Sequence, residues 1–217
     1  MKSLITLLFT LLLLPYGIGV SAQTFTSSPL PDSIFALMQG KSWREGCPVS
    51  RHDLRYLRVA HYDADGREQH GELVVNKAIA NDVLTILRAL HAARYPIERM
   101  TLIDHYDGDD ERSMSANNSS CFCARAVTNG RTLSRHAYGM AVDINPLYNP
   151  YVKKLPSGKQ LVAPRGGKSY LDRTKKSPYM IIKGDLCYRL FKKYGFSWGG
   201  DWRSCKDYQH FEKNHQP

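Results

Sequence analysis

The clearest hydrophobic pattern in the chain lies in residues 77–95, KAIANDVLTILRALHAARY. The apolar side chains recur with the period of a helix and fall on one face, and they are Ile79, Val83, Ile86, Leu87 and Leu90. Asn76 can cap the start of this helix, and Pro96 follows shortly after its end. The pattern therefore predicts an amphipathic helix with one buried stripe.

Shorter patterns predict the remaining elements. Strands are expected over residues 70–76, 99–106, 140–146 and 208–213, and helices over 32–38 and 184–195. Long polar or irregular loops are expected over 107–133 and 147–180. Without a repeat or a linker between these elements, the order favours a single α+β domain. We expect a small, mainly antiparallel sheet with helices on one side and long loops around one face.

The first 22 residues resemble an export signal. Lys2 precedes an unbroken apolar run, and Val20, Ser21 and Ala22 supply the small residues of a cleavage site after Ala22. The run is shorter than the roughly 20 residues of a permanent membrane span. We therefore expect a periplasmic or secreted protein with no permanent membrane anchor, an N-terminal tail over 23–45 and a domain over 46–217.

Charge and cysteine content add little about partners. The formal net charge is +10, which attracts polyanions such as nucleic acid, acidic lipid or cell-wall polymers, and which also simply favours solubility. No clustered basic and aromatic motif supports nucleic-acid binding, so we expect none, and we expect a monomer. The five cysteines are an odd number, and Cys187 with Cys205 is the preferred disulfide pair because the two flank one compact segment.

Two polar segments carry the candidate chemistry. The first is SRHAYGMAVDINP (134–146), in which His136 and Asp143 stand seven residues apart. Asp143 lies inside an apolar strand, where a carboxylate is costly to bury unless it is paired or bound to a metal. On spacing alone, a buried histidine or aspartate is more often a hydrogen-bonded structural residue than a metal ligand.

The second segment is WGGDWRSCKDYQHFEK (198–213), in which Asp207 stands three residues before His210. Together with His136 and Asp143 it provides two histidines and one carboxylate, a usual catalytic zinc set that leaves a fourth position open. A nearby carboxylate such as Asp207 would serve as a general base. In a regular strand Asp207 and His210 would face opposite sides, so the chain must turn or bulge between them.

The pattern Ser134-x-His136-x-x-Gly139-x-Ala141-x-Asp143, followed by Asp207-x-x-His210 behind WGGDW, resembles the VanY-type D-alanyl-D-alanine carboxypeptidase family. This zinc family also includes L-alanyl-D-glutamate endopeptidases. The resemblance implies that His136, Asp143 and His210 bind zinc in a cleft surrounded by the long loops, and that Asp207 is the catalytic base. It also implies that Arg125 steadies the developing oxyanion, that Ser134 orients the loop or contacts substrate, and that Asp201 supports a ligand histidine.

The expected function is therefore an exported zinc metallopeptidase that cleaves a D-amino-acid-containing bond of peptidoglycan stem peptides. Asp207 stands where the carboxypeptidase branch usually has Glu, which resembles the L-Ala–D-Glu endopeptidase branch more than the D-Ala–D-Ala branch. The leading alternative is a zinc-containing peptidoglycan-binding module with little activity. A secreted nuclease is a more distant alternative, which only the basic charge supports.

Overall fold

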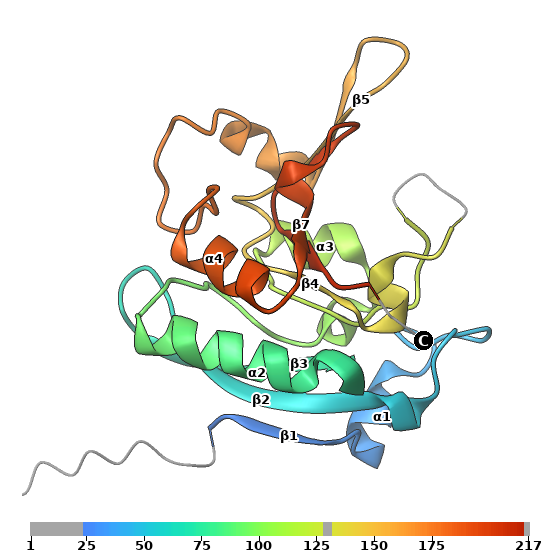
Figure 1. Cartoon of the computed structure of the whole chain (residues 1–217). Coiled ribbons are helices and arrows are strands. Elements are labelled where there is room, and N and C mark those ends of the chain that lie inside the picture. The colour runs from blue at the N-terminus through green and yellow to red at the C-terminus, as the bar shows by residue number, and fades with distance from the viewer. Residues whose placement is uncertain (1–23, 128–131, 215–217) are drawn as a thin grey trace, which may run out of the picture.

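The computed structural model describes residues 24–127 and 132–214; the predicted signal segment, residues 1–22, lies outside them. The described chain combines helices with three small antiparallel sheets, and this mixed α+β architecture confirms the predicted fold class (Figure 1). Where one sheet was expected, the strands divide into three groups of three. Within the described ranges, no helix has the length and apolar character needed to cross a membrane.

The first sheet has the order β1-β2-β3 and is antiparallel throughout. Its strands are β1 (Thr26–Pro29), β2 (Leu54–Tyr62) and β3 (Glu68–Asn76). The strand predicted at 70–76 is therefore confirmed and begins slightly earlier. The segment predicted as an N-terminal tail supplies β1 and α1 (Asp32–Met38), a helix with the predicted bounds. A short 3₁₀ turn, η1 (Arg51–Asp53), leads into β2.

Helix α2 (Lys77–Ala92) covers one face of this sheet, as Figure 1 shows. The predicted stripe is buried, since Ile79, Val83, Ile86, Leu87 and Leu90 are each at most 2% exposed. The carboxamide oxygen of Asn76 accepts the N–H of Ala78 at 3.0 Å, so the predicted cap forms. Each large aliphatic side chain buried here stabilises the fold by about 1.5–3 kcal/mol.

The second sheet holds the chemistry and has the order β4-β9-β7. Its strands are β4 (Ala141–Asp143), β9 (His210–Glu212) and β7 (Ser197–Trp198). Helix α4 (Leu186–Lys193) packs against it, with Phe191 stacked on Phe211 at 4.1 Å between ring centroids. Its predicted end is marked by Gly195, at φ 83°. The strands expected in 140–146 and 208–213 are therefore confirmed in shorter form.

The third sheet corrects the prediction that residues 147–180 are irregular. It has the order β6-β5-β8, formed by β5 (Tyr151–Lys154), β6 (Gln160–Ala163) and β8 (Lys206–Asp207). The β5–β6 hairpin stands out from the body in Figure 1, and the 3₁₀ helix η4 (Arg165–Tyr170) follows it. Two four-residue strands give too short a pattern to recognise, although Gly158 in the turn between them, at φ 81°, is a hairpin signal.

The strand predicted at 99–106 is wrong. Residues 103–106 form the 3₁₀ helix η2 (Ile103–Tyr106), because the Asp104 carboxylate accepts the Ser42 N–H at 3.1 Å and Asp107 is left-handed at φ 60°. The loop predicted over 107–133 contains helix α3 (Asp110–Ser115), which Asp109 caps by accepting the N–H of Arg112. That cap was a readable signal for a helix start.

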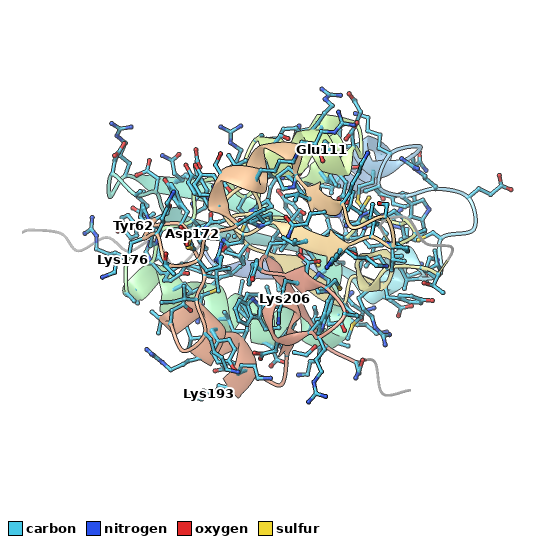
Figure 2. All side chains as sticks on the ribbon, turned by 90° about the horizontal axis from the view of Figure 1, so that it is seen from above. Tyr62, Glu111, Asp172, Lys176, Lys193 and Lys206 are labelled. Carbon is cyan, nitrogen blue, oxygen red and sulfur yellow. The ribbon has the colours of Figure 1, made fainter. Side chains whose placement is uncertain are left out.

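The predicted disulfide between Cys187 and Cys205 does not form, and all five cysteines are free. Cys187 lies in α4 with its side chain fully buried in the core, whereas Cys205 is partly exposed. Sequence proximity suggested the pair, but the helix turns Cys187 into the interior. Figure 2 shows Lys176 and Lys193 at the edge of the molecule, and both are exposed.

Candidate metal centre

Three side chains from distant parts of the chain meet in one buried cluster. One ligand atom each from His136, Asp143 and His210 lies within 4.8 Å of the others. Nε2 of His136 is 3.1 Å from Oδ2 of Asp143 and 3.2 Å from Nδ1 of His210, which is 3.0 Å from Oδ1 of Asp143. The antiparallel register pairs Asp143 in β4 with His210 in β9 and so brings the two segments together.

His136 is held by hydrogen bonds on the side away from the cluster. It lies in the 3₁₀ helix η3 (Arg135–Tyr138), and the Ser134 hydroxyl accepts its backbone N–H at 3.3 Å. Its Nδ1 lies 2.5 Å from the carbonyl oxygen of Cys121, so Nδ1 carries the proton. Nε2 is therefore left with a lone pair that points into the cluster.

His210 is held in the same way, with the two ring nitrogens exchanged. Its Nε2 lies 3.1 Å from the carboxylate of Glu212, which accepts the N–H, so Nδ1, which faces Asp143 and His136, is the nitrogen available to a metal ion. Sequence reasoning missed Glu212. The signal was present, because residues two apart in a strand share a face and 212 stands two after 210.

Electrostatics at the cluster match a site built for a cation. Burial would raise the pKa of Asp143, but His136 and His210 hold it well below its usual range. Burial lowers the pKa of His210, yet the hydrogen bonds to Asp143 and Glu212 outweigh this and raise it to about 10. The two carboxylates therefore favour positive charge at this point, either as a proton on the ring or as a metal ion.

The donor set fits zinc. Two imidazole nitrogens and one carboxylate oxygen are buried and converge, and each histidine is fixed by a second hydrogen-bond partner. Three such protein ligands with one open position are typical of catalytic zinc sites. The structure thus brings together the three residues predicted as ligands, and they could hold a metal ion.

Gly139 explains why this loop can lie so close to the sheet. It ends η3 in the left-handed region at φ 64°, where a side chain is strained. A Cβ atom there would stand 2.7 Å from the backbone nitrogen of Asn76, which donates to the Gly139 carbonyl oxygen at 2.9 Å. The glycine thereby fastens the segment that carries His136 to the end of β3.

Asp207 meets the condition that its predicted role requires. Strand β8 ends at Asp207 and β9 begins at His210, so the chain bends between them, and both side chains line one pocket. Trp198 Nε1 donates to the carbonyl oxygen of Tyr208 at 2.9 Å and holds this bend. Burial raises the pKa of Asp207 to about 7. Its Oδ1 atom is buried and has no hydrogen-bond partner among the described residues.

The WGGDW motif, residues 198–202, packs against this bend and stabilises it. A Cβ atom on Gly199 would lie 2.5 Å from the carbonyl oxygen of Asp207, so only glycine fits there. The Lys206 ammonium, labelled in Figure 2, donates to the carbonyl oxygens of Gly200 and Trp202 at 3.1 and 2.7 Å. Asp201 pairs with Lys183 at 3.0 Å and is not among the hydrogen-bond partners of His136 or His210, so the predicted support of a ligand histidine by Asp201 is wrong.

Arg125 reaches the same pocket and is paired there. Its guanidinium lies 2.8 Å from the carboxylate of Asp110 at the start of α3. Although burial lowers the pKa of Arg125, Asp110 raises it, so the guanidinium stays charged. Its Nε is buried and without a partner in the part of the chain that the structure describes. Sequence reasoning missed Asp110, because only the fold brings these two side chains together.

These groups share one pocket of about 360 Å³, a size that suits a short peptide segment. Beside the cluster, Asp207, Arg125 and Ser134, its wall includes apolar side chains: Met114, Val127, Leu133 and Trp202. Val127 and Leu133 are 39% and 44% exposed and add accessible apolar surface to the pocket. The pocket therefore combines charged groups, which could act on a peptide bond, with apolar side chains, which could contact the rest of a peptide.

Comparison with known families agrees with the motif. Residues 128–213 match a family model described as D-alanyl-D-alanine carboxypeptidase. The matched segment contains His136, Asp143, Asp207 and His210, whereas Arg125 precedes it. No solved structure matches the chain. Over residues 128–213, the chain therefore resembles the D-alanyl-D-alanine carboxypeptidase family.

Proposed function

We propose that this protein is an exported zinc metallopeptidase that hydrolyses a D-amino-acid-containing bond in peptidoglycan stem peptides. One observation carries the proposal: the buried His136–Asp143–His210 cluster shares its pocket with Asp207 and Arg125. The family match over residues 128–213 supports a peptide substrate. The substrate bond is L-Ala–D-Glu or D-Ala–D-Ala, and Asp207 in place of Glu favours the first.

His136, Asp143 and His210 would hold the zinc ion, and zinc lowers the pKa of a bound water and polarises a carbonyl group. The protein side chains divide the remaining work. Hydrolysis joins a water oxygen to the carbonyl carbon, breaks the C–N bond and places a proton on the leaving amine. Asp207, with a pKa of about 7, accepts the proton from the water and returns it to that nitrogen.

Arg125 supplies fixed positive charge to the carbonyl oxygen while that oxygen becomes an anion. Its ion pair with Asp110 and its unpartnered Nε among the described residues leave one N–H free for a new acceptor. Removing such a donor from an oxyanion site costs about 100-fold or more in turnover. Ser134 keeps the loop in place through the backbone of His136.

The alternative is a binding module of the same fold that holds zinc and has little activity. The pocket favours catalysis because burying the Asp207 carboxylate there lowers the stability of the fold. An isolated carboxylate oxygen buried without a partner costs stability, and a binding module has no use for a base with a pKa of about 7.

Digestion of purified muropeptides by the zinc-loaded protein tests this proposal. We expect products whose masses correspond to the addition of one water at a single stem-peptide bond, formed about 100-fold more slowly or worse by Asp207→Asn as a matched variant. A zinc-binding protein that leaves every muropeptide intact would support the binding module. Degradation of RNA or DNA with all muropeptides intact would support the nuclease.

Export is part of the proposal. It rests on Lys2, on the apolar run and on the small residues before Gln23. Sequencing the protein recovered from the periplasm or the medium should find Gln23 at the N-terminus. A mature form that retains Met1 would contradict export by cleavage.

A further inference from the structure

One face of the sheet β6-β5-β8 lines the pocket. Tyr151 in β5 pairs with Asp207 on one side and with Ala163 on the other, and all three side chains line the pocket. Residues two apart along a strand share a face. The next row outward therefore contains Lys153, which also lines the pocket and lies about 7 Å along the strand from Tyr151.

Among the described residues, Lys153 differs from the other long cationic side chains of the pocket because its ammonium has no partner. Arg125 is paired with Asp110 at 2.8 Å, and Arg135 donates to the side-chain oxygen of Asn214 at 3.0 Å. Lys153 is exposed, and its ammonium has no hydrogen-bond or ion-pair partner within the part of the chain that the structure describes. A charged group held at the edge of a substrate pocket without a partner is available to an anionic ligand.

Both candidate bonds present the same anion next to the scissile nitrogen. In D-Ala–D-Ala, the residue that leaves as the amine carries the terminal α-carboxylate. In the L-Ala–D-Glu bond of a stem peptide, D-Glu continues the chain through its side-chain carboxyl group, so its α-carboxylate is also free. A site that binds this α-carboxylate would accept substrates with either bond. It would discriminate against substrates in which this carboxylate is amidated.

We propose that Lys153 is a specificity-determining residue that binds the α-carboxylate of the amino acid on the amine side of the cleaved bond. This inference rests on the proposed peptidase function and names its substrate class. An ammonium–carboxylate hydrogen bond is among the stronger polar contacts, so its loss should cost about 10-fold or more in kcat/KM. Because Lys153 lies a row away from Asp207, it contacts substrate without taking part in proton transfer.

The chain supplies a matched control in Lys154. It follows Lys153 in β5, is likewise exposed, and points to the opposite face because neighbouring strand residues alternate. It does not line the pocket. Replacing either lysine changes the net charge by the same amount and removes no described contact. Any difference between the two variants therefore reports position rather than overall charge.

The experiment measures kcat/KM of the zinc-loaded protein on two peptide pairs. One pair ends in D-Ala–D-Ala as the free acid or the carboxamide, and the other contains L-Ala–D-Glu with the α-carboxylate free or amidated. Wild type should prefer the acid in the pair it cleaves by about 10-fold or more. Lys153→Gln should remove most of this preference, whereas Lys153→Arg and Lys154→Gln should keep it.

The outcomes separate this inference from the function on which it rests. Equal cleavage of acid and amide by wild type overturns the role of Lys153 and leaves the peptidase standing. An unchanged preference in Lys153→Gln, or a preference lost only in Arg135→Ala, also overturns it. Cleavage of none of the four peptides, by a protein that holds zinc, overturns the proposed function and this inference together.

Discussion

The carboxylate of Glu212 lies 3.1 Å from Nε2 of His210, on the side of the ring opposite the metal cluster. This contact fixes a proton on Nε2 and turns Nδ1 toward Asp143, 3.0 Å away, where it is available to a metal ion. The final strand therefore supplies both a candidate ligand and the group that orients it.

Changing Glu212 to Gln should weaken zinc binding by about 10- to 100-fold, the usual cost of losing a partner behind a ligand. Titration with a competing chelator measures the affinity. Glu68→Gln is the matched control, because Glu68 pairs with Nε2 of His91 at 2.6 Å outside the cluster. Equal zinc affinity in the Glu212 and Glu68 variants would mean that Glu212 has no role behind the metal.

Changing Asp207 to Asn keeps the shape of the side chain and removes the base. Turnover should fall by about 100-fold or more, while zinc content stays near that of wild type. Kinetics on the cleaved muropeptide together with metal analysis measure both quantities. If the variant loses its zinc, Asp207 is a ligand; if turnover is unchanged, Asp207 is structural and the mechanism is wrong.

Arg125 and Asp110 should behave as one unit. Arg125→Ala should lower kcat by about 100-fold. Asp110→Asn should lower it less, because the guanidinium remains but loses its 2.8 Å partner. Asp109→Asn serves as control, since asparagine still caps α3 and Asp109 does not contact Arg125. If Asp110→Asn and Asp109→Asn have the same kcat as wild type, Asp110 does not position the arginine.

Any side chain in place of Gly139, the glycine that ends η3, should lower the stability of the fold. Gly139→Ala adds left-handed strain of about 1–2 kcal/mol and overpacking of about 1–3 kcal/mol against Asn76. Gly158→Ala, at φ 81° with open space around it, should show the strain alone. Urea unfolding measures the two free energies of unfolding. If the Gly139 variant loses no more stability than the Gly158 variant, the close approach to Asn76 is not limiting.

The elements predicted most accurately are those in which several local sequence signals agree. The stripe from Ile79 to Leu90 and the cap at Asn76 point to the same helix, and that helix forms. The apolar run before Asp104 suggested a strand, but the Asp104 side chain bonds to a distant backbone N–H of Ser42 and turns the chain. A contact across 62 residues cannot be read from a local pattern.

The same limit applies to the site. Residue type and spacing made His136, Asp143 and His210 candidate ligands. Only the register of β4 with β9 sets the 3.0 Å contact between Asp143 and His210, and only the turn η3 places His136 within 3.2 Å of both. Asp110 and Lys153 reach the pocket through a helix and a hairpin that the sequence pattern did not predict. Loops were expected in both places, and their side chains therefore had no predicted position.

The zinc content of the purified protein tests the central claim most directly. Elemental analysis should find close to one zinc per chain in wild type and in His105→Ala, whose histidine lies outside the cluster. It should find little in His136→Ala and in His210→Ala. Retention of one zinc per chain in both cluster variants would contradict this account.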